Sequence, residues 1–244
     1  MLRNKWFLVT GAALVAAVGC AASTSTPQAA SGDNDAGTPA GSDDAGTSSG
    51  DDTGTGSSGF DSGVSVQAVA LPFFVSDQFV ASGFMGDYTG LTVSQDPTKC
   101  KSPRQPNAGG FCYTATWVPK IGDAGSDWTG VYWQSPANNW GAKPGKPISS
   151  GATKVTFYAA GAVGGEILSI SVGGINANGA SASLTYGDSF DVKQPPITLT
   201  TAWTQYTVSL SGTSYTSVLG AFCFVVTAMT NTSESFYIDD VQWQ

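Results

Sequence analysis

Four aromatic rings and three amide side chains are concentrated in the segment from residue 128 to residue 140. They are Trp128, Tyr132, Trp133, Trp140, Gln134, Asn138 and Asn139. A sugar presents apolar C–H faces and a rim of hydroxyl groups, so a site for it combines flat rings with planar hydrogen-bonding groups. The segment therefore predicts a carbohydrate-binding surface.

Strand alternation divides this segment between two faces. If residues 130–134 form a strand, Tyr132 and Gln134 share one face and Trp133 lies on the other. Aromatic residues are also common in the cores of β-sandwiches, so core packing remains the alternative for each ring. Residues 138–141 are typical of a turn and are better placed to line the rim of a site.

The chain contains no histidine. This excludes Ser-His-Asp and Cys-His catalysis and any metal site with histidine ligands. A pair of carboxylates, as in glycoside hydrolases, remains open, and the folded part of the chain has two glutamates, Glu166 and Glu234. We expect Glu234 to be solvated in a turn, and no paired strand carboxylates are evident. The sequence therefore favours a protein that is not an enzyme.

Glu166 occupies an unusual position for a charged residue. By strand parity it shares a face with Leu168, Ile170 and Val172, although charged side chains are rarely buried. It is a general acid with a raised pKa, a hydrogen-bonding contact in a binding cleft, or an exposed residue at the start of a strand. We include it among the candidate ligand-binding residues, with a hydrolase or lyase as the less favoured function.

The net charge of −8 is distributed unevenly along the chain. Residues 21–63 are almost entirely Ala, Ser, Thr, Gly, Asp and Pro, with seven acidic residues and no basic one. Such a segment cannot bury enough apolar surface to offset its ordering entropy, so we expect a disordered tether. Residues 64–244 are nearly neutral. This balance argues against a nucleic-acid partner, which requires a basic surface.

The first 20 residues are typical of an export signal. Arg3 and Lys5 precede an apolar stretch, residues 6–18, that is too short for a stable membrane span. The end of this stretch resembles the lipobox of bacterial lipoproteins, which implies a lipid anchor on Cys20 and a place in the cell envelope. An ordinary secretory signal is the alternative. Because residue 21 is alanine, not the aspartate associated with inner-membrane retention, we expect the outer membrane.

One folded domain, residues 64–244, follows the tether. Eight short segments show the alternation of a half-buried strand and are separated by Gly, Pro and Asn turns. They are residues 113–118, 130–134, 153–160, 166–172, 181–186, 203–210, 221–228 and 236–243. No segment has a sustained helical apolar stripe. The pattern predicts an all-β, antiparallel sandwich or barrel.

The cysteines of this domain have two different expected roles. Cys100 and Cys112 bracket a loop with two prolines and two glycines. In an oxidising compartment a disulfide would close this loop and stabilise the domain by about 2–3 kcal/mol. Cys223 lies between two phenylalanines in an apolar strand. We therefore expect it to be a buried thiol without a chemical role.

The C-terminal strands resemble a known family. Residues 236–243, FYIDDVQW, resemble the closing strand of carbohydrate-binding modules with a galactose-binding-like jelly roll. Residues 203–210, WTQYTVSL, resemble the strand that often precedes it, and residues 76–79 lie near the expected first strand. The resemblance covers most of residues 73–244. It implies a jelly-roll β-sandwich that binds a glycan without catalysis.

The same resemblance implies a structural calcium ion. Many such modules hold calcium between an acidic residue near the first strand and another in the last strand. In this sequence those positions are Asp77 and either Asp239 or Asp240. Calcium prefers six to eight oxygen ligands, and an ion here would pin the two ends of the domain together. The alternative is that Asp239 and Asp240 mark a β-bulge in an edge strand.

These expectations combine into one hypothesis. The chain is expected to be a monomeric surface lipoprotein that presents a non-catalytic carbohydrate-binding β-sandwich on a flexible tether. The alternative is a structural or adhesive surface protein without a sugar ligand.

Overall fold

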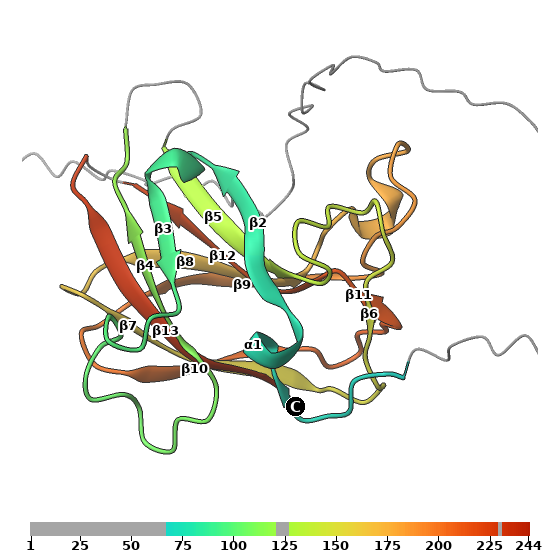
Figure 1. Ribbon diagram of the computed structural model, residues 1–244, viewed down its shortest axis with the longest axis horizontal. Coiled ribbons are helices and arrows are strands. Elements are labelled where there is room, and N and C mark those ends of the chain that lie inside the picture. Colours follow the sequence, from blue (N-terminus) through green and yellow to red (C-terminus); the bar gives the residue numbers. More distant parts are fainter. Residues whose placement is uncertain (1–66, 121–126, 229–230) are drawn as a thin grey trace, which may run out of the picture. The chain divides into compact units, whose positions relative to one another are not determined.

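Two antiparallel β-sheets form the domain, with a short two-stranded sheet beside them (Figure 1). The computed structural model describes residues 67–120, 127–228 and 231–244. The predicted antiparallel β-sandwich is confirmed. The predicted signal and tether, residues 1–63, lie outside the described residues. Within the described ranges no helix is long and apolar enough to cross a membrane.

The first sheet has six strands in the order β10-β7-β13-β4-β3, with β1 also paired to β13. Its strands are β1 (Phe73–Phe74), β3 (Leu91–Ser94), β4 (Cys112–Trp117), β7 (Lys154–Gly161), β10 (Thr204–Ser209) and β13 (Glu234–Trp243). Strand β13 is central, because β7 pairs with one of its sides and β4 with the other.

The second sheet has five strands in the order β2-β5-β12-β8-β9. Its strands are β2 (Val80–Gly86), β5 (Trp128–Gln134), β8 (Ile167–Gly173), β9 (Asp191–Thr198) and β12 (Gly220–Thr227). The small sheet pairs β6 (Lys146–Pro147) with β11 (Ser217–Val218), and the helices are α1 (Val75–Gln78), η1 (Tyr88–Gly90) and η2 (Ala177–Gly179).

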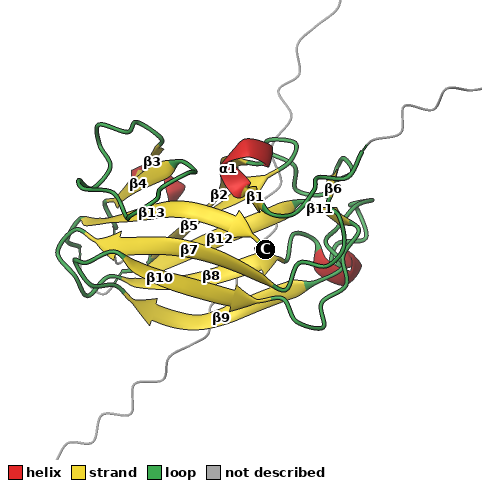
Figure 2. Ribbon diagram, turned by 90° about the horizontal axis from the view of Figure 1, so that it is seen from below, coloured by secondary structure: helices red, strands yellow, loops and turns green. Residues whose placement is uncertain are grey.

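Aromatic rings from both sheets interlock in the core. Figure 2 shows β13, β7 and β10 in front of β5, β12 and β8. Between these layers Phe157 of β7 contacts Phe222 of β12, with ring centroids 5.1 Å apart. Phe236 of β13 and Phe224 of β12 are 5.0 Å apart. Phe222 and Phe224 of β12 therefore both point inward, and burial of these rings contributes to the stability of the domain.

Seven of the eight predicted strands are present, but residues 181–186 form no strand. The side chain of Asn176 explains the difference. Its Nδ2 donates to the Tyr186 carbonyl at 2.9 Å, and its Oδ1 accepts from the Ser181 N–H at 2.7 Å. These local hydrogen bonds satisfy backbone groups that a strand would have paired in a ladder, so the segment remains a loop.

Strands β2, β3 and β9 are present although the sequence pattern did not predict them. Strand β9 contains Pro195 and Pro196, which are tolerated because β9 is at the edge of its sheet. Strand β2 has a register shift between Ala81 and Gly83, and this bulge interrupts its alternation. Strand β3 has only four residues.

Candidate functional site

The side of the five-stranded sheet that faces away from the core carries a second apolar cluster. On β5, Val131 and Trp133 pack in the core, whereas Tyr132 lies in this second cluster. The predicted division of the strand between two faces is confirmed. The other members of the cluster are Met85, Ile175, Leu219, Cys223 and Val225. Cys223 is buried, as predicted.

Two tryptophans pack against this cluster. The rings of Tyr132 and Trp140 meet edge to face, with centroids 6.0 Å apart and planes at 88°, a favourable geometry for aromatic pairs. Trp128 packs against the same cluster, and both tryptophans are only half-buried. Three of the four rings singled out in the sequence therefore lie together. We call Trp128, Tyr132, Gln134 and Trp140 the aromatic face.

Two glycines allow Tyr132 to lie close to the sheet. A Cβ atom at Gly220 would be 2.8 Å from Cδ1 of the Tyr132 ring. A Cβ atom at Gly83 would be 2.9 Å from the Tyr132 Cβ and 2.6 Å from Nε2 of Gln134. All three distances are shorter than a Cβ atom tolerates, so Gly83 and Gly220 cannot be replaced by residues with a side chain.

Gln134 is buried, and one of its amide atoms has no partner. Its Oε1 accepts from the Ser82 hydroxyl at 3.2 Å. Its Nε2 has no hydrogen-bond partner in the structure although it is buried. A buried donor without an acceptor costs about 1–3 kcal/mol. Because Gln134 is fully buried, a ligand on the surface does not reach this donor.

The two asparagines of the segment have structural contacts. Asn139 is buried, and its Nδ2 donates to the Lys143 carbonyl at 2.8 Å. Its Oδ1 accepts from the N–H groups of Gly141 and Lys143. Asn139 therefore shapes its own loop, and its amide is not available as the expected ligand contact. Asn138 is exposed, and its backbone N–H donates to the Ser82 hydroxyl.

Asp188 supports the cluster and was not singled out in the sequence. It is buried, and its carboxylate accepts from the N–H groups of Leu219 at 2.7 Å, Ile175 at 3.0 Å and Gly220 at 3.3 Å. Burial raises the pKa of Asp188 to about 7, in spite of these three donors. The carboxylate joins the start of β12 to the loop that follows β8, next to Tyr132.

Glu166 and Glu234 lie in the same pocket at one end of the sandwich. Glu166 is buried, as strand parity predicts, but the pocket that it lines includes none of the predicted aromatic ligand residues. Glu234 was expected in a solvated turn. It instead begins β13 and is half-buried. The expectation for Glu234 is wrong because the loops before β8 and β13 converge, which no local pattern encodes.

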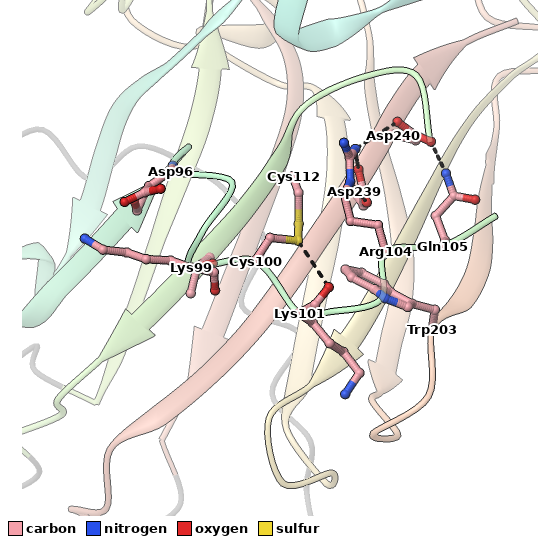
Figure 3. Close-up of a disulfide and its surroundings, with 12 residues drawn as sticks. Asp96, Lys99, Cys100, Lys101, Arg104, Gln105, Cys112, Trp203, Asp239 and Asp240 are labelled. Atoms are coloured by element: carbon pink, nitrogen blue, oxygen red, sulfur yellow. Dashed lines mark hydrogen bonds and ion pairs between the residues drawn. A yellow bond between two sulfur atoms is a disulfide. The ribbon is translucent and has the colours of Figure 1, made fainter. Parts of the chain in front are cut away.

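Asp239 forms a buried ion pair on the outward side of the six-stranded sheet (Figure 3). Its carboxylate accepts two hydrogen bonds from the guanidinium of Arg104, one of them from Nε at 2.8 Å. Hydrogen bonding to Asp239 raises the pKa of Arg104. Arg104 belongs to the loop that the predicted disulfide between Cys100 and Cys112 closes, and this disulfide is present.

Asp240 holds the other end of the same loop. Its carboxylate accepts from the Gln105 amide and from the backbone N–H groups of Gly109 and Gly110. Asp240 has a φ of 48°, and the pairing of β13 with β7 shifts register after Asp239. The predicted bulge is therefore present, but in a central strand and not at an edge. Burial raises the pKa of Asp240.

These contacts do not fit the calcium site that the family resemblance implies. The guanidinium of Arg104 forms ion pairs with the carboxylates of Asp239 and Asp240, and its positive charge would repel a divalent cation. Asp77 is exposed, and among the described residues the group suited to a metal near Asp239 contains Cys100 and Cys112, which are joined in the disulfide. Calcium held by Asp77 with Asp239 or Asp240 stays a prediction without support from this geometry.

No protein-family model matches the chain, and no curated protein matches it. Several solved structures do. The chain is similar in structure to carbohydrate-binding modules. A family 30 module of the cellulosomal cellulase Cel9D-Cel44B of Clostridium thermocellum has a TM-score of 0.44 and 15% identity, covering 71% of this chain and 97% of that one.

Two further solved structures are similar to a smaller extent. A family 11 module of the cellulase Lic26A-Cel5E of the same organism has a TM-score of 0.38 and 15% identity, covering 72% of this chain and 95% of that one. The K1 cleaved adhesin domain of Lys-gingipain from Porphyromonas gingivalis W83 has a TM-score of 0.37 and 13% identity, covering 71% and 96%.

Replacing Arg104 with glutamine should destabilise the domain. The change leaves Asp239 buried without its counter-charge, which typically costs about 3–5 kcal/mol. Because the Arg104 side chain is 34% exposed, we expect about 2–3 kcal/mol in urea unfolding followed by tryptophan fluorescence. Lys101→Gln, in the same loop, is the matched control and should change stability by less than about 0.5 kcal/mol. Equal stability of Arg104→Gln and the parent chain would contradict the role of this ion pair.

Asp188 should make stability depend on pH. Its pKa is about 7 in the folded chain, against an ordinary value of 3.8 for an aspartate, so it favours the folded state most below pH 4. This contribution declines as the pH rises to about 7 and is constant above it. Asp188→Asn should remove the decline, which amounts to at most about 1.4 kcal/mol per pH unit.

The measurement is urea unfolding of both proteins at several pH values between 4 and 8. Glu234 and Asp240, whose pKa values are also raised, act equally in both proteins and cancel in the comparison. Parallel curves for the two proteins would show that Asp188 does not titrate in this range.

Proposed function

We propose that the domain is a non-catalytic carbohydrate-binding module whose ligand contacts the aromatic face. One observation carries this proposal. Trp128, Tyr132 and Trp140 gather on the outward side of the five-stranded sheet, and the tryptophans keep part of their surface exposed. Of the four rings in this segment, only that of Trp133 belongs to the core.

The chemistry of the aromatic face suits a sugar. Half-buried tryptophan rings offer flat apolar surface for the C–H face of a pyranose at a low cost in side-chain entropy. The rigid sheet and the glycines beside Tyr132 hold these groups in place before the ligand arrives, which reduces the ordering cost of binding.

The proposal assigns no catalytic step. The carboxylate pair of Glu166 and Glu234 lines a pocket that includes no residue of the aromatic face. Its volume, about 210 Å³, is below the range of about 300–1,000 Å³ that is usual for ligand sites. An assay of reducing-sugar release from the polysaccharides that the chain binds tests this part, and release of new chain ends would contradict it.

The proposal also includes the place of the protein in the cell. A lipid on Cys20 would anchor the chain in the bacterial envelope, and the acidic segment 21–63 would act as the tether. A flexible chain of this length spans about 35–40 Å on average. The domain would then meet polysaccharide beyond the membrane surface. We propose that the membrane holding the lipid anchor is the outer membrane.

Substitution of the exposed rings should weaken glycan binding. In affinity electrophoresis against a panel of polysaccharides, Trp128→Ala and Trp140→Ala should each lower the affinity by about tenfold or more, because aromatic anchors carry most of the binding energy of such surfaces. Thermal melts of each variant establish that it is folded.

Trp203→Ala is the matched control. Trp203 is also half-buried, but it precedes β10 of the other sheet and contacts Tyr237, so its loss should leave retention unchanged. If no polysaccharide retains the parent chain, the protein is a structural or adhesive surface protein instead. If only Trp203→Ala weakens retention, the ligand binds the opposite sheet and the proposed site is wrong.

Lipidation should depend on Cys20. In a bacterial host grown with a labelled fatty acid, the parent chain should carry the label and Cys20→Ser should not. Cys223→Ser, which changes a buried thiol of the domain, should retain it. A parent chain that is exported without label would indicate an ordinary secretory signal.

A further inference from the structure

A pocket of about 210 Å³ lies at the end of the sandwich where two loops meet, each of which connects the two sheets. One loop joins β7 to β8, and the other joins β12 to β13. The described residues that line the pocket are Val163, Gly164, Gly165, Glu166, Ile167, Thr227, Thr232, Ser233 and Glu234. No residue of the aromatic face belongs to this set.

The carboxylate of Glu166 is buried with half of its hydrogen-bonding capacity unused. The residue is 6% exposed. Its Oε1 accepts from the Val163 N–H at 3.0 Å, whereas its Oε2 is buried and has no partner. The carboxylate rests directly on Gly161, where a Cβ atom would be 1.9 Å from Oε2. A buried carboxylate oxygen without a donor is costly, so a compensating group is expected at this place.

Glu234 adds a second acidic group to the same pocket. Burial raises the pKa of Glu234, and the negative charge of Glu166 raises it further. The ion pairs within the described part of the chain involve neither glutamate. The pocket therefore concentrates negative charge that the described residues do not neutralise.

The remaining lining supplies neutral oxygen atoms and bare backbone. Thr227 and Ser233 bring hydroxyl groups to the pocket. Gly164 and Gly165 have φ values of 86° and 96°, so the β7–β8 loop turns through left-handed backbone without side chains that would fill the space. At about 30 Å³ for each water molecule, the pocket has the volume of about seven waters.

We propose that this pocket binds a calcium ion, held by the carboxylates of Glu166 and Glu234 together with hydroxyl, backbone and water oxygens. Calcium takes six to eight oxygen ligands in flexible geometry, which suits two carboxylates from two converging loops. An oligosaccharide would need a larger cavity. The ion would supply the positive charge that compensates the Glu166 carboxylate. It would also link the β7–β8 loop to the β12–β13 loop. This site differs from the one that the family resemblance implies, and it does not rest on the proposed glycan binding.

Terbium luminescence measures binding directly. Trp117 is paired with Glu234 across β4 and β13 and can sensitise a terbium ion in the pocket. For the full chain we expect a saturable signal that calcium displaces. Glu166→Gln and Glu234→Gln should each weaken terbium and calcium binding by at least tenfold. With only two carboxylate ligands we expect a calcium Kd of about 10⁻⁴–10⁻³ M.

Thermal melts give an independent readout. At a calcium concentration ten times the Kd, the Tm of the parent chain should rise by about 3–6 °C. EDTA should reverse the rise, and Glu166→Gln should not show it. Asp96→Asn, which removes an exposed carboxylate bonded to Thr98, is the matched control and should behave like the parent chain.

Several outcomes would overturn the proposal. One is a parent chain without a saturable, calcium-displaceable signal. Another is retention of full affinity by both glutamate variants. Loss of binding in Asp240→Asn but not in Glu166→Gln would return calcium to the last strand. A Tm rise with glucosamine but none with calcium would identify an ammonium site. Glycan retention measured in EDTA keeps these outcomes separate from the proposed function.

Discussion

The interlocking of aromatic rings between the two sheets constrains much of the surface. The ring of Trp133 lies 4.9 Å from that of Tyr113 and 5.3 Å from that of Phe222. A slip of β5 by one residue would remove Trp133 from the core and turn Tyr132 into it. Because the core holds Trp133, Tyr132 must face the other side, where Trp140 meets it. Packing inside the sandwich therefore determines which rings remain for a ligand outside.

Local alternation made the strands and their faces predictable, whereas contacts between distant segments were not. The inward faces of β5 and β12 follow directly from residues two apart. Arg104 and Asp239 are 135 residues apart, and no spacing in the sequence indicates that they pair. Asp188 likewise bonds to Leu219, 31 residues later. Strand parity placed Glu166 on an apolar face and left its burial open, whereas Glu234 was expected in a solvated turn. No local pattern shows that the two loops that connect the sheets bring these residues into one pocket.

The buried carboxylates are compensated in different ways. Asp239 has a guanidinium, which supplies a full opposite charge. Asp188 has three backbone N–H groups, and burial still raises its pKa to about 7. Glu166 has one backbone donor. Asp239 is thus compensated by a full positive charge, Asp188 by three peptide dipoles and Glu166 by one. Glu166, the least compensated of the three, lines a pocket.

The central place of β13 has a consequence for how the protein is made. Strands β10 and β7 lie on one side of it and β4 and β3 on the other. Until residues 234–243 have left the ribosome, these two pairs have no strand to join them. Folding of the six-stranded sheet must therefore wait for the last segment, and its pairings are of long range, which favours slow, all-or-none assembly.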